Sequence, residues 1–261
     1  MSDILSELCS IRRRDAEERA LSVPFEEMVR RAALARPARG FAQAFAADGI
    51  NVIAELKKAS PSAGMIREDF PHMELAAELE AAGAAAISVL VEPHRFLGSE
   101  RYLEDVSRIV SIPVLYKDFV TTRYQVAAAR AAGADAVLLI AAALDDAALA
   151  DLIGFVHELG FEALVETHDE VEIERSLVAG ARVVGVNCRN LRDFSMDLGR
   201  ISRMIGSVRR PAIRIAESGM LDYDAILGAR VAGADGFLVG TALMRAQRPG
   251  EKLREMMGVG R

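Results

Sequence analysis

The chain has 261 residues, 51% of them hydrophobic and 27% charged, with a formal net charge of −6 at pH 7. This composition is typical of an ordinary soluble globular protein, and the acidic balance argues against nucleic acid or an anionic membrane as a partner. Two cysteines are too few for a disulfide framework. No apolar stretch has the length of a membrane span and the first residues lack a signal-peptide pattern, so a cytoplasmic location is expected.

The first fifty residues predict two helices ahead of the main domain. Asp3 is a candidate cap for the first helix, and Ser22 with Pro24 marks the start of the second, which Pro37 ends. Apolar side chains such as Leu5 are expected to pack these helices against the domain that follows. We favour the interpretation that these helices cover the floor or the flank of the main domain. The alternative is that they close over a substrate.

From residue 51 onward the chain repeats a two-strand unit four times. In each copy a small-residue helix end runs through glycine into an apolar strand, because glycine adopts positive φ at little cost. The apolar runs lack polar alternation, as parallel strands covered on both faces do. One more strand fits between successive copies, at 51–56, 113–117, 163–166 and 213–217. The four glycines are Gly83, Gly133, Gly180 and Gly233. Eight strands, each followed by helical sequence, predict a single (β/α)8 TIM barrel domain over 1–261, with residues 1–50 an N-terminal helical extension packed on it.

Charged side chains stand where the first strand ends. Ile53, Glu55 and Lys57 share one face by the two-residue period of a strand, so a carboxylate and an ammonium point inward above Ile53. Burying a charge is costly unless the charge is paired. The structural alternative to an active site here is an ion pair that closes the top of the barrel core.

Four later strands repeat this pattern, and polar groups at the C-terminal ends of several strands are what an active site in a barrel requires. Arg189 follows the sixth strand, whereas the strand at 137–140 ends without a polar group and is expected to form an apolar wall. The four side chains that end strands are Lys117, Glu166, Asn187 and Glu217.

Two loops are candidates for a phosphate site, because barrels commonly hold phosphate after the seventh and eighth strands. These loops contain Ser218-Gly219 and Gly240-Thr241. Each glycine lets the backbone approach an anion, and each hydroxyl is expected to cap the next helix. A branched residue at Gly240 is therefore expected to block the anion while leaving the catalytic lysine and glutamates undisturbed.

Other chemistry has less support in the sequence. His168 lies just past the fifth strand and is a candidate base, but Glu166 is better placed on the strand face. We expect neither a metal nor a cofactor, because no histidines and carboxylates have ligand spacing and no dinucleotide fingerprint is present. Cys188 alternates away from Asn187 and is expected to be inert packing.

The strand ends carry several short motifs. They read Glu55-Leu56-Lys57-Lys58-Ala59-Ser60-Pro61-Ser62, Phe96-Leu97-Gly98-Ser99, Lys117-Asp118-Phe119, Asn187-Cys188-Arg189-Asn190-Leu191 and Glu217-Ser218-Gly219. With these motifs the chain resembles the indole-3-glycerol-phosphate synthase family over essentially its whole length. The departures are mild: Val91 stands where threonine is frequent, Thr241 replaces serine, and Asn190 replaces aspartate.

The resemblance implies a ring closure. The family converts 1-(2-carboxyphenylamino)-1-deoxyribulose 5-phosphate into indole-3-glycerol phosphate, a step of tryptophan biosynthesis that releases carbon dioxide and water. It implies that Lys117 protonates the ketose oxygen and that Glu166 is the base of the dehydration. Lys57 would hold an anionic group and deliver a proton in the second half, and Glu55 would orient Lys57.

The resemblance also implies the binding residues. Asn187 would bind hydroxyls, and Glu217 with Ser218 would line the floor of the site. The substrate would contact Ser60, Phe96, Arg189 and Leu191, and its phosphate would contact Ser218, Gly219, Gly240 and Thr241. A monomer acting on a small phosphorylated anilino-ketose, without nucleic acid or membrane, is the expected state.

Two other functions stay open at this point. A phosphoribosylanthranilate isomerase needs a carboxylate and a second acid or base, typically aspartate and cysteine, at strand ends. The first strand here has no cysteine, and the sixth ends in Asn187. A non-catalytic phosphate-binding barrel would not need charges at five strand ends, which destabilise an empty pocket.

Overall fold

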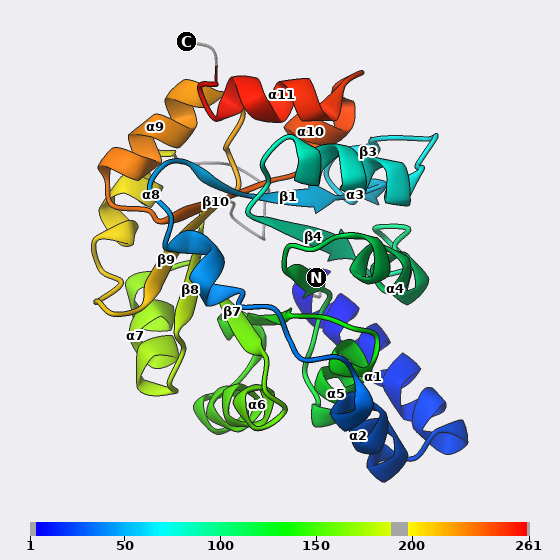
Figure 1. The fold of residues 1–261 in the computed structure, drawn as a ribbon. Coiled ribbons are helices and arrows are strands. Elements are labelled where there is room, and N and C mark those ends of the chain that lie inside the picture. The colour runs from blue at the N-terminus through cyan, green and yellow to red at the C-terminus, as the bar shows by residue number, and fades with distance from the viewer. Residues whose placement is uncertain (1–3, 189–197, 260–261) are drawn as a thin grey trace.

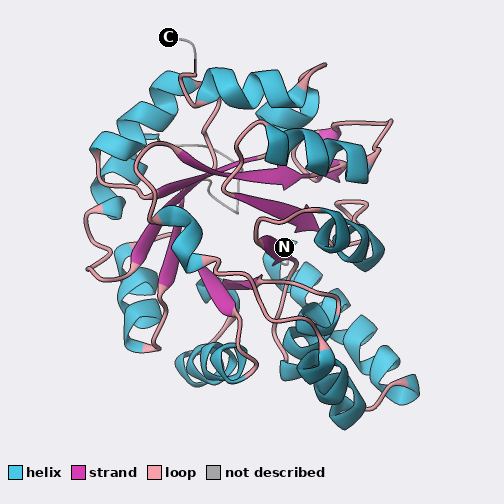
Figure 2. Cartoon of the chain, viewed as in Figure 1, coloured by secondary structure: helices cyan, strands magenta, loops and turns pink. Residues whose placement is uncertain are grey.

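A computed structural model describes residues 4–188 and 198–259. Eight parallel strands close into a barrel inside a ring of helices (Figures 1 and 2), which confirms the predicted (β/α)8 fold. The strands are β1 (Asn51–Leu56), β4 (Ala86–Leu90), β5 (Val114–Lys117), β6 (Ala136–Ile140), β7 (Glu162–Thr167), β8 (Val183–Asn187), β9 (Ile213–Glu217) and β10 (Gly236–Val239). Their order around the barrel is β1-β10-β9-β8-β7-β6-β5-β4.

Helices follow the strands and cover the outside of the barrel. Short elements fill some connections: the 3₁₀ turn η2 (Ala141–Ala143) after β6, and an antiparallel hairpin of β2 (Ala59–Ser60) and β3 (Gly64–Met65) after β1. The helices are α3 (His72–Ala81), α4 (Glu100–Ile109), α5 (Arg123–Ala131), α6 (Asp146–Glu158), α7 (Glu170–Val178), α8 (Leu198–Ile205), α9 (Tyr223–Val231), α10 (Thr241–Arg245) and α11 (Pro249–Met256).

The four repeated glycines end helices as predicted. Their φ angles are 100° at Gly83, 97° at Gly133, 94° at Gly180 and 105° at Gly233. In each copy the alanine after the glycine donates its backbone N–H to a carbonyl five residues back, as Ala84 does to Leu79 at 3.1 Å. This is the hydrogen bond of a Schellman motif, in which a left-handed residue reverses the chain. The chain then enters the next strand directly.

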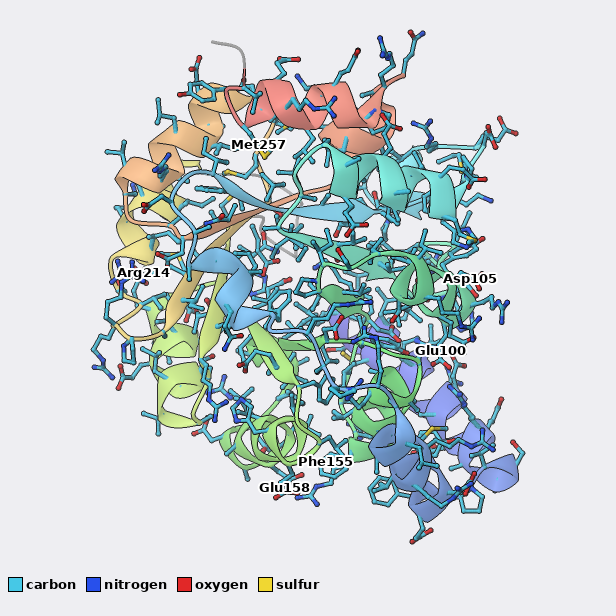
Figure 3. All side chains as sticks on the ribbon, viewed as in Figure 1. Glu100, Asp105, Phe155, Glu158, Arg214 and Met257 are labelled. Atoms are coloured by element: carbon cyan, nitrogen blue, oxygen red, sulfur yellow. The ribbon has the colours of Figure 1, made fainter. Side chains whose placement is uncertain are left out.

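Two apolar layers hold the barrel together. One lies between the strands and the outer helices, where side chains fill the space (Figure 3). The other fills the barrel interior, with Ile53, Leu115 and Leu164 among its buried members. Phe41 and Phe45 belong to the interior cluster, and their ring centroids are 5.2 Å apart. A Cβ atom on Gly236 would lie 2.6 Å from the Phe45 ring, so the glycine at the start of β10 admits that ring.

The N-terminal extension forms α1 (Ile4–Ser22), α2 (Phe25–Leu34) and the 3₁₀ turn η1 (Ala42–Phe45). Helix α2 packs on α5, and η1 brings Phe45 into the interior cluster near the start of β10. Helix α1 is tied to α4, because Arg19 contacts Glu100 at 2.9 Å (Glu100 is labelled in Figure 3). Among the described residues, no helix is long and apolar enough to cross a membrane.

A buried carboxylate joins the segment after α2 to the barrel. Asp135 lies just before β6 and is fully buried. Its two oxygens contact the Arg36 guanidinium at 2.7 and 2.8 Å. They also accept the backbone N–H groups of Arg39 at 2.7 Å and of Val114 at 2.9 Å. Asp135 therefore connects the extension to β5 and β6 through one side chain.

We predict that Asp135→Asn lowers the free energy of unfolding by about 3 kcal/mol, the scale for breaking a buried charge pair, because an amide cannot accept all four hydrogen bonds. Urea denaturation measures this loss. The matched control is Asp151→Asn, which removes an exposed ion pair with Arg123 and should cost under about 0.5 kcal/mol. Equal losses in the two variants would mean that Asp135 contributes no more than a surface ion pair.

Candidate active site

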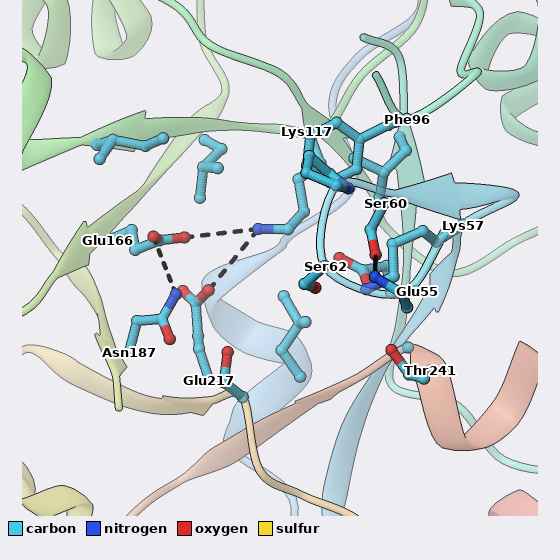
Figure 4. A pocket seen from close by; sticks show the side chains of 18 of the residues that line it. Glu55, Lys57, Ser60, Ser62, Phe96, Lys117, Glu166, Asn187, Glu217 and Thr241 are labelled. Atoms are coloured by element: carbon cyan, nitrogen blue, oxygen red, sulfur yellow. Dashed lines mark hydrogen bonds and ion pairs between the residues drawn. The ribbon is translucent and has the colours of Figure 1, made fainter. Parts of the chain in front are cut away.

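A cavity of about 550 Å³ lies at the C-terminal ends of the strands (Figure 4). Its size suits a small ligand. The sequence-predicted residues that line it are Glu55, Lys57, Ser60, Phe96, Lys117, Glu166, Asn187, Glu217, Ser218, Gly219, Gly240 and Thr241. Two others, Arg189 and Leu191, lie outside the described residues. Every predicted site residue that the structure describes is thus brought to one place.

Strand pairing brings the catalytic candidates to the C-terminal ends of the barrel strands. Asn187 at the end of β8 is paired with Glu217 at the end of β9, and Glu166 on β7 is paired with Ile140 on β6. The side chains of Lys117, Glu166 and Glu217 then point toward one another (Figure 4). Lys117 Nζ lies 3.5 Å from Glu166 Oε2 and 3.8 Å from Glu217 Oε2. Asn187 donates its amide N–H to Glu166 Oε1 at 3.0 Å.

The charges of Lys117 and Glu166 stabilise each other. Burial by itself would lower the pKa of Lys117, but the carboxylates of Glu166, Glu217 and Glu55 outweigh it and raise that pKa above its ordinary value. Burial would likewise raise the pKa of Glu166, yet Lys117 and its hydrogen-bond donors hold it well below the usual range. At neutral pH the site therefore contains an ammonium beside a carboxylate.

Glu217 has the opposite tendency. Burial and the neighbouring charge of Glu166 raise the pKa of Glu217 to about 8, so the group carries a proton at neutral pH. Among the described residues its buried Oε1 atom has no hydrogen-bond partner. This side chain fits because β8 has a glycine beside it: a Cβ on Gly185 would lie 2.9 Å from Glu217 Cδ and closer still to Oε1.

Gly185 was missed as a site residue in the sequence. It lies within the apolar run of β8 and reads there as part of a buried strand. The available signal is the glycine itself, because a glycine inside a strand often marks the close approach of another group.

The predicted pair at the end of β1 is present. Lys57 Nζ is hydrogen-bonded to Glu55 Oε2, and both side chains line the cavity. The two alternatives for this strand end therefore both apply, because the same two side chains form an ion pair and line the cavity. Burial opposes ionisation of Glu55, but Lys57 and Lys117 outweigh it and lower the pKa of Glu55 below its usual range.

Gly240 lies against this pair, which makes one expectation wrong. A Cβ on Gly240 would lie 2.9 Å from Glu55 Cδ and 3.1 Å from Lys57 Nζ. A branched residue there would displace Glu55 and Lys57, so it cannot test the phosphate loop by itself. The close approach joins β10 to β1 across the closing seam of the barrel, a contact that the sequence does not display.

One side of the cavity is apolar. Leu138 and Ile140 of β6 line it, as expected for a strand without polar end groups. Phe96 also lines the cavity, with its ring centroid 5.9 Å from that of Phe119. Leu5 and Leu8 of α1 also line the cavity, so the first helix lies at the catalytic end of the barrel. The favoured position therefore holds only in part, because the start of α1 reaches the cavity while a later part of α1 lies on the flank of the barrel against α4.

The loop that carries Phe96 is built around one carboxylate. Glu92 is fully buried after β4. Its two oxygens accept the backbone N–H groups of His94 and Arg95 at 2.7 Å and of Phe96 at 2.8 Å. Glu92 therefore fixes the backbone that presents Phe96 to the cavity. The sequence analysis did not single out Glu92.

The candidate phosphate loops differ in detail from the expectation. Ser218 and Gly219 both have left-handed backbone, with φ of 64° and 72°. Left-handed φ is uncommon for a serine and is found at strained functional sites. Ser218 does not cap α9, because that helix starts later and Asp222 caps it, accepting from Ala225 N at 2.9 Å. Thr241 is the first residue of α10 and Gly240 its cap, without a side-chain hydrogen bond.

Two minor expectations concern metals and cysteine. Within residues 4–188 and 198–259, no group of three or more His, Cys, Asp or Glu side chains is arranged to hold a metal ion. The absence of a metal in the working enzyme stays a prediction. Cys188 is buried after β8, with its Sγ 3.7 Å from the Ser218 carbonyl oxygen.

Two solved structures with the same fold are enzymes named for other phosphorylated compounds. A 3-hexulose-6-phosphate synthase superposes with a TM-score of 0.66 at 15% identity, covering 80% of this chain and 99% of that one. A thiamine phosphate pyrophosphorylase from Pyrococcus furiosus gives 0.61 at 16% identity, covering 80% and 95%. At such low identity these likenesses show the barrel fold alone.

Sequence comparison is more specific. The model of the family described as indole-3-glycerol phosphate synthase matches residues 5–256. Indole-3-glycerol phosphate synthase 1 of Streptomyces coelicolor is 42% identical over 257 residues, covering 98% of this chain and 96% of the relative. The indole-3-glycerol phosphate synthase of Burkholderia cenocepacia is 42% identical over 260 residues, covering 98% and 99%. The chain therefore belongs to the indole-3-glycerol phosphate synthase family.

Proposed function

We propose that the cavity closes the indole ring of 1-(2-carboxyphenylamino)-1-deoxyribulose 5-phosphate. The observation that carries this proposal is the ammonium of Lys117 between the buried carboxyl groups of Glu166 and Glu217. An acid and a base of different proton affinity then face one substrate-sized space, beside an apolar wall for an aromatic ring. The identity of the substrate is inferred from the family to which the chain belongs.

In the first step an aromatic carbon attacks the ketose carbonyl carbon, and the carbonyl electron pair moves onto the oxygen. Lys117 donates a proton to that oxygen, which becomes a hydroxyl. The carboxylates around Lys117 keep it protonated at neutral pH, so the acid is loaded before substrate binds. Its positive charge also stabilises the developing oxyanion.

In the second step the bond from the ring to the carboxylate breaks. Its electron pair restores the aromatic ring, and carbon dioxide leaves. The new hydroxyl then departs as water after Lys57 donates a proton to it, while Glu166 removes a proton from the adjacent carbon. Lys117 and Lys57 each donate one proton and Glu166 accepts one, so each turnover takes up one proton from solvent.

The remaining contacts bind the substrate. We assign its phosphate to the loops at Ser218-Gly219 and Gly240-Thr241, and its aromatic ring to the space between Phe96 and the β6 wall. These residues line one cavity. Asn187 takes a sugar hydroxyl, and Ser60 supports the loop above β1. A cofactor-free reaction, a monomeric chain and a cytoplasmic location stay predictions.

Incubating the purified chain with the anilino-ketose phosphate and following indole fluorescence tests the function. We predict that Lys117→Ala lowers kcat by at least about a hundredfold, the scale for loss of a general acid. KM should change little, because the assigned phosphate loops follow other strands. Lys252→Ala, on the outer helix α11, is the control and should keep full activity. If kcat survived and only KM rose, Lys117 would be a binding residue and Lys57 the next candidate for the acid.

Glu166→Gln should stall the dehydration, because glutamine keeps the shape of the side chain and loses its basicity. In a single turnover we expect carbon dioxide release to precede indole formation, with kcat about a hundredfold lower. Glu162→Gln, at the other end of the same strand, is the matched control. Simultaneous release of both products at nearly the wild-type rate would contradict the assignment.

Thr241→Val tests the phosphate loop in place of a change at Gly240. Valine matches threonine in shape and lacks the hydroxyl, so we expect KM to rise about tenfold, the scale of one hydrogen bond to a charged group. A substrate without its phosphate should be turned over equally poorly by both proteins. If the variant still distinguished the two substrates as the wild type does, the phosphate would lie elsewhere. The thermal midpoint without ligand checks that the fold is intact.

A further inference from the structure

His168 stands between two carboxylates at the end of β7. Its Nε2 atom lies 3.2 Å from Glu166 Oε1, and its Nδ1 atom lies 3.2 Å from Glu172 Oε2. The backbone N–H of His168 also donates to Glu172 Oε2 at 2.7 Å. Glu172 therefore contacts both the backbone and the ring of His168. Both carboxylates and the imidazole are largely buried, with 14% of the His168 side chain exposed.

Glu172 is held in place by the start of α7. Its backbone N–H donates to Asp169 Oδ1, the cap of that helix, at 2.8 Å. The side chain of Glu172 then reaches back over the first turn to His168, in the manner of a capping box. The orientation of the imidazole is thus determined by the helix that follows the strand.

The two contacts determine the protonation of the ring. Nδ1 is hydrogen-bonded to Glu172 Oε2, whereas Nε2 faces Glu166 Oε1 at 3.2 Å as an ion pair without a hydrogen bond. Two carboxylates on opposite sides of one ring favour its charged form. Burial opposes the charged ring, but the carboxylates of Glu166 and Glu172 on either side outweigh it and raise the pKa of His168 to about 10. The ring is therefore an imidazolium at neutral pH.

We propose that His168 is a positioning residue for the ring-closure reaction: its imidazolium, held by Glu172, forms an ion pair with Oε1 of Glu166 and leaves Oε2 to accept the proton from the substrate. The inference rests on the proposed role of Glu166 as the base. His168 itself contacts no substrate atom. It controls the charge and the orientation of Glu166, which does.

The charged groups around Glu166 come from several strands. Lys117 on β5 faces Oε2, while Asn187 on β8 and His168 share Oε1. Glu217 on β9 and Glu55 on β1 add nearby carboxyl groups. Lys117 and His168 are the cations in contact with Glu166, and Lys57 offsets the charge of Glu55. Loss of the His168 charge should therefore raise the pKa of Glu166 and let it take up a proton at higher pH.

The test is the pH dependence of kcat for His168→Gln. Because Glu166 must be ionised to act as the base, we expect the acid limb of the profile to move upward by about one pH unit or more. At neutral pH kcat should fall at least about tenfold, the usual scale for a partner that orients a catalytic group. KM and inhibition by inorganic phosphate should stay within about twofold, since the assigned phosphate loops follow other strands.

The chain supplies a matched control at the other end of the same strand. His157 on α6 lies 2.9 Å from Glu162 at the start of β7, with 18% of its side chain exposed. His157→Gln removes a similar histidine–glutamate contact away from the cavity, so its pH profile should coincide with that of the wild type. An unchanged acid limb in His168→Gln, with a thermal midpoint like that of the control, would overturn the proposal.

A second measurement uses the wild-type protein and so does not depend on whether His168→Gln folds. In the wild-type protein with ¹⁵N-labelled histidine, both ring nitrogens of His168 should keep the chemical shifts of the protonated form up to about pH 9. In Glu172→Gln the ring should titrate at lower pH, because one carboxylate is gone. Titration near the ordinary value of 6.5 in the wild type would overturn the proposal. Full turnover by Glu166→Gln would instead refute the proposed role of Glu166 as the base. That result is distinct from an unchanged acid limb in His168→Gln and from titration of His168 near its ordinary pKa.

Discussion

The ammonium of Lys117 is the interaction on which the site depends. Buried carboxyl groups from three strands converge at the top of the barrel, and without a cation their mutual repulsion and burial would leave them protonated. Lys117, together with Lys57 beside Glu55, offsets this, so that Glu166 and Glu55 are ionised while Glu217 stays protonated at neutral pH. Lys117, with Lys57 beside Glu55 and His168 beside Glu166, thus separates three chemically equal side chains into different protonation states. Acid–base catalysis needs this kind of separation.

Space for these groups comes from residues that have no side chain. Gly185 leaves room for the carboxyl group of Glu217, and Gly240 leaves room for Glu55 and Lys57. A methyl group at either position would displace the side chain that it meets, Glu217 in one case and Glu55 in the other. Close packing therefore controls the electrostatics, because small displacements change how strongly buried charges interact. The glycines belong to the site although they carry no reactive atom.

The extension completes the barrel at both ends. Phe41 and Phe45 enter the interior cluster near the start of β10, and Leu5 and Leu8 line the cavity at the other end. Arg36 fastens the intervening segment to Asp135. An open barrel end would expose apolar side chains or leave a charged cavity in contact with bulk water, where ion pairs are weak. The first fifty residues thus bear on both the stability and the chemistry of the barrel.

The sequence by itself determined the barrel and the inward face of its strands. Helix ends at Gly83 and its three equivalents, and the inward side chains of Glu55, Lys117, Glu166 and Glu217, follow from local backbone geometry that repeats every two or 3.6 residues. Only the tertiary structure decided what these side chains meet. That Gly240 lies against Glu55, that α1 reaches the cavity, and that Glu217 keeps a proton all depend on packing between segments far apart in the chain. Periodicity carries no information on such contacts, because burial and distance arise only when the barrel closes.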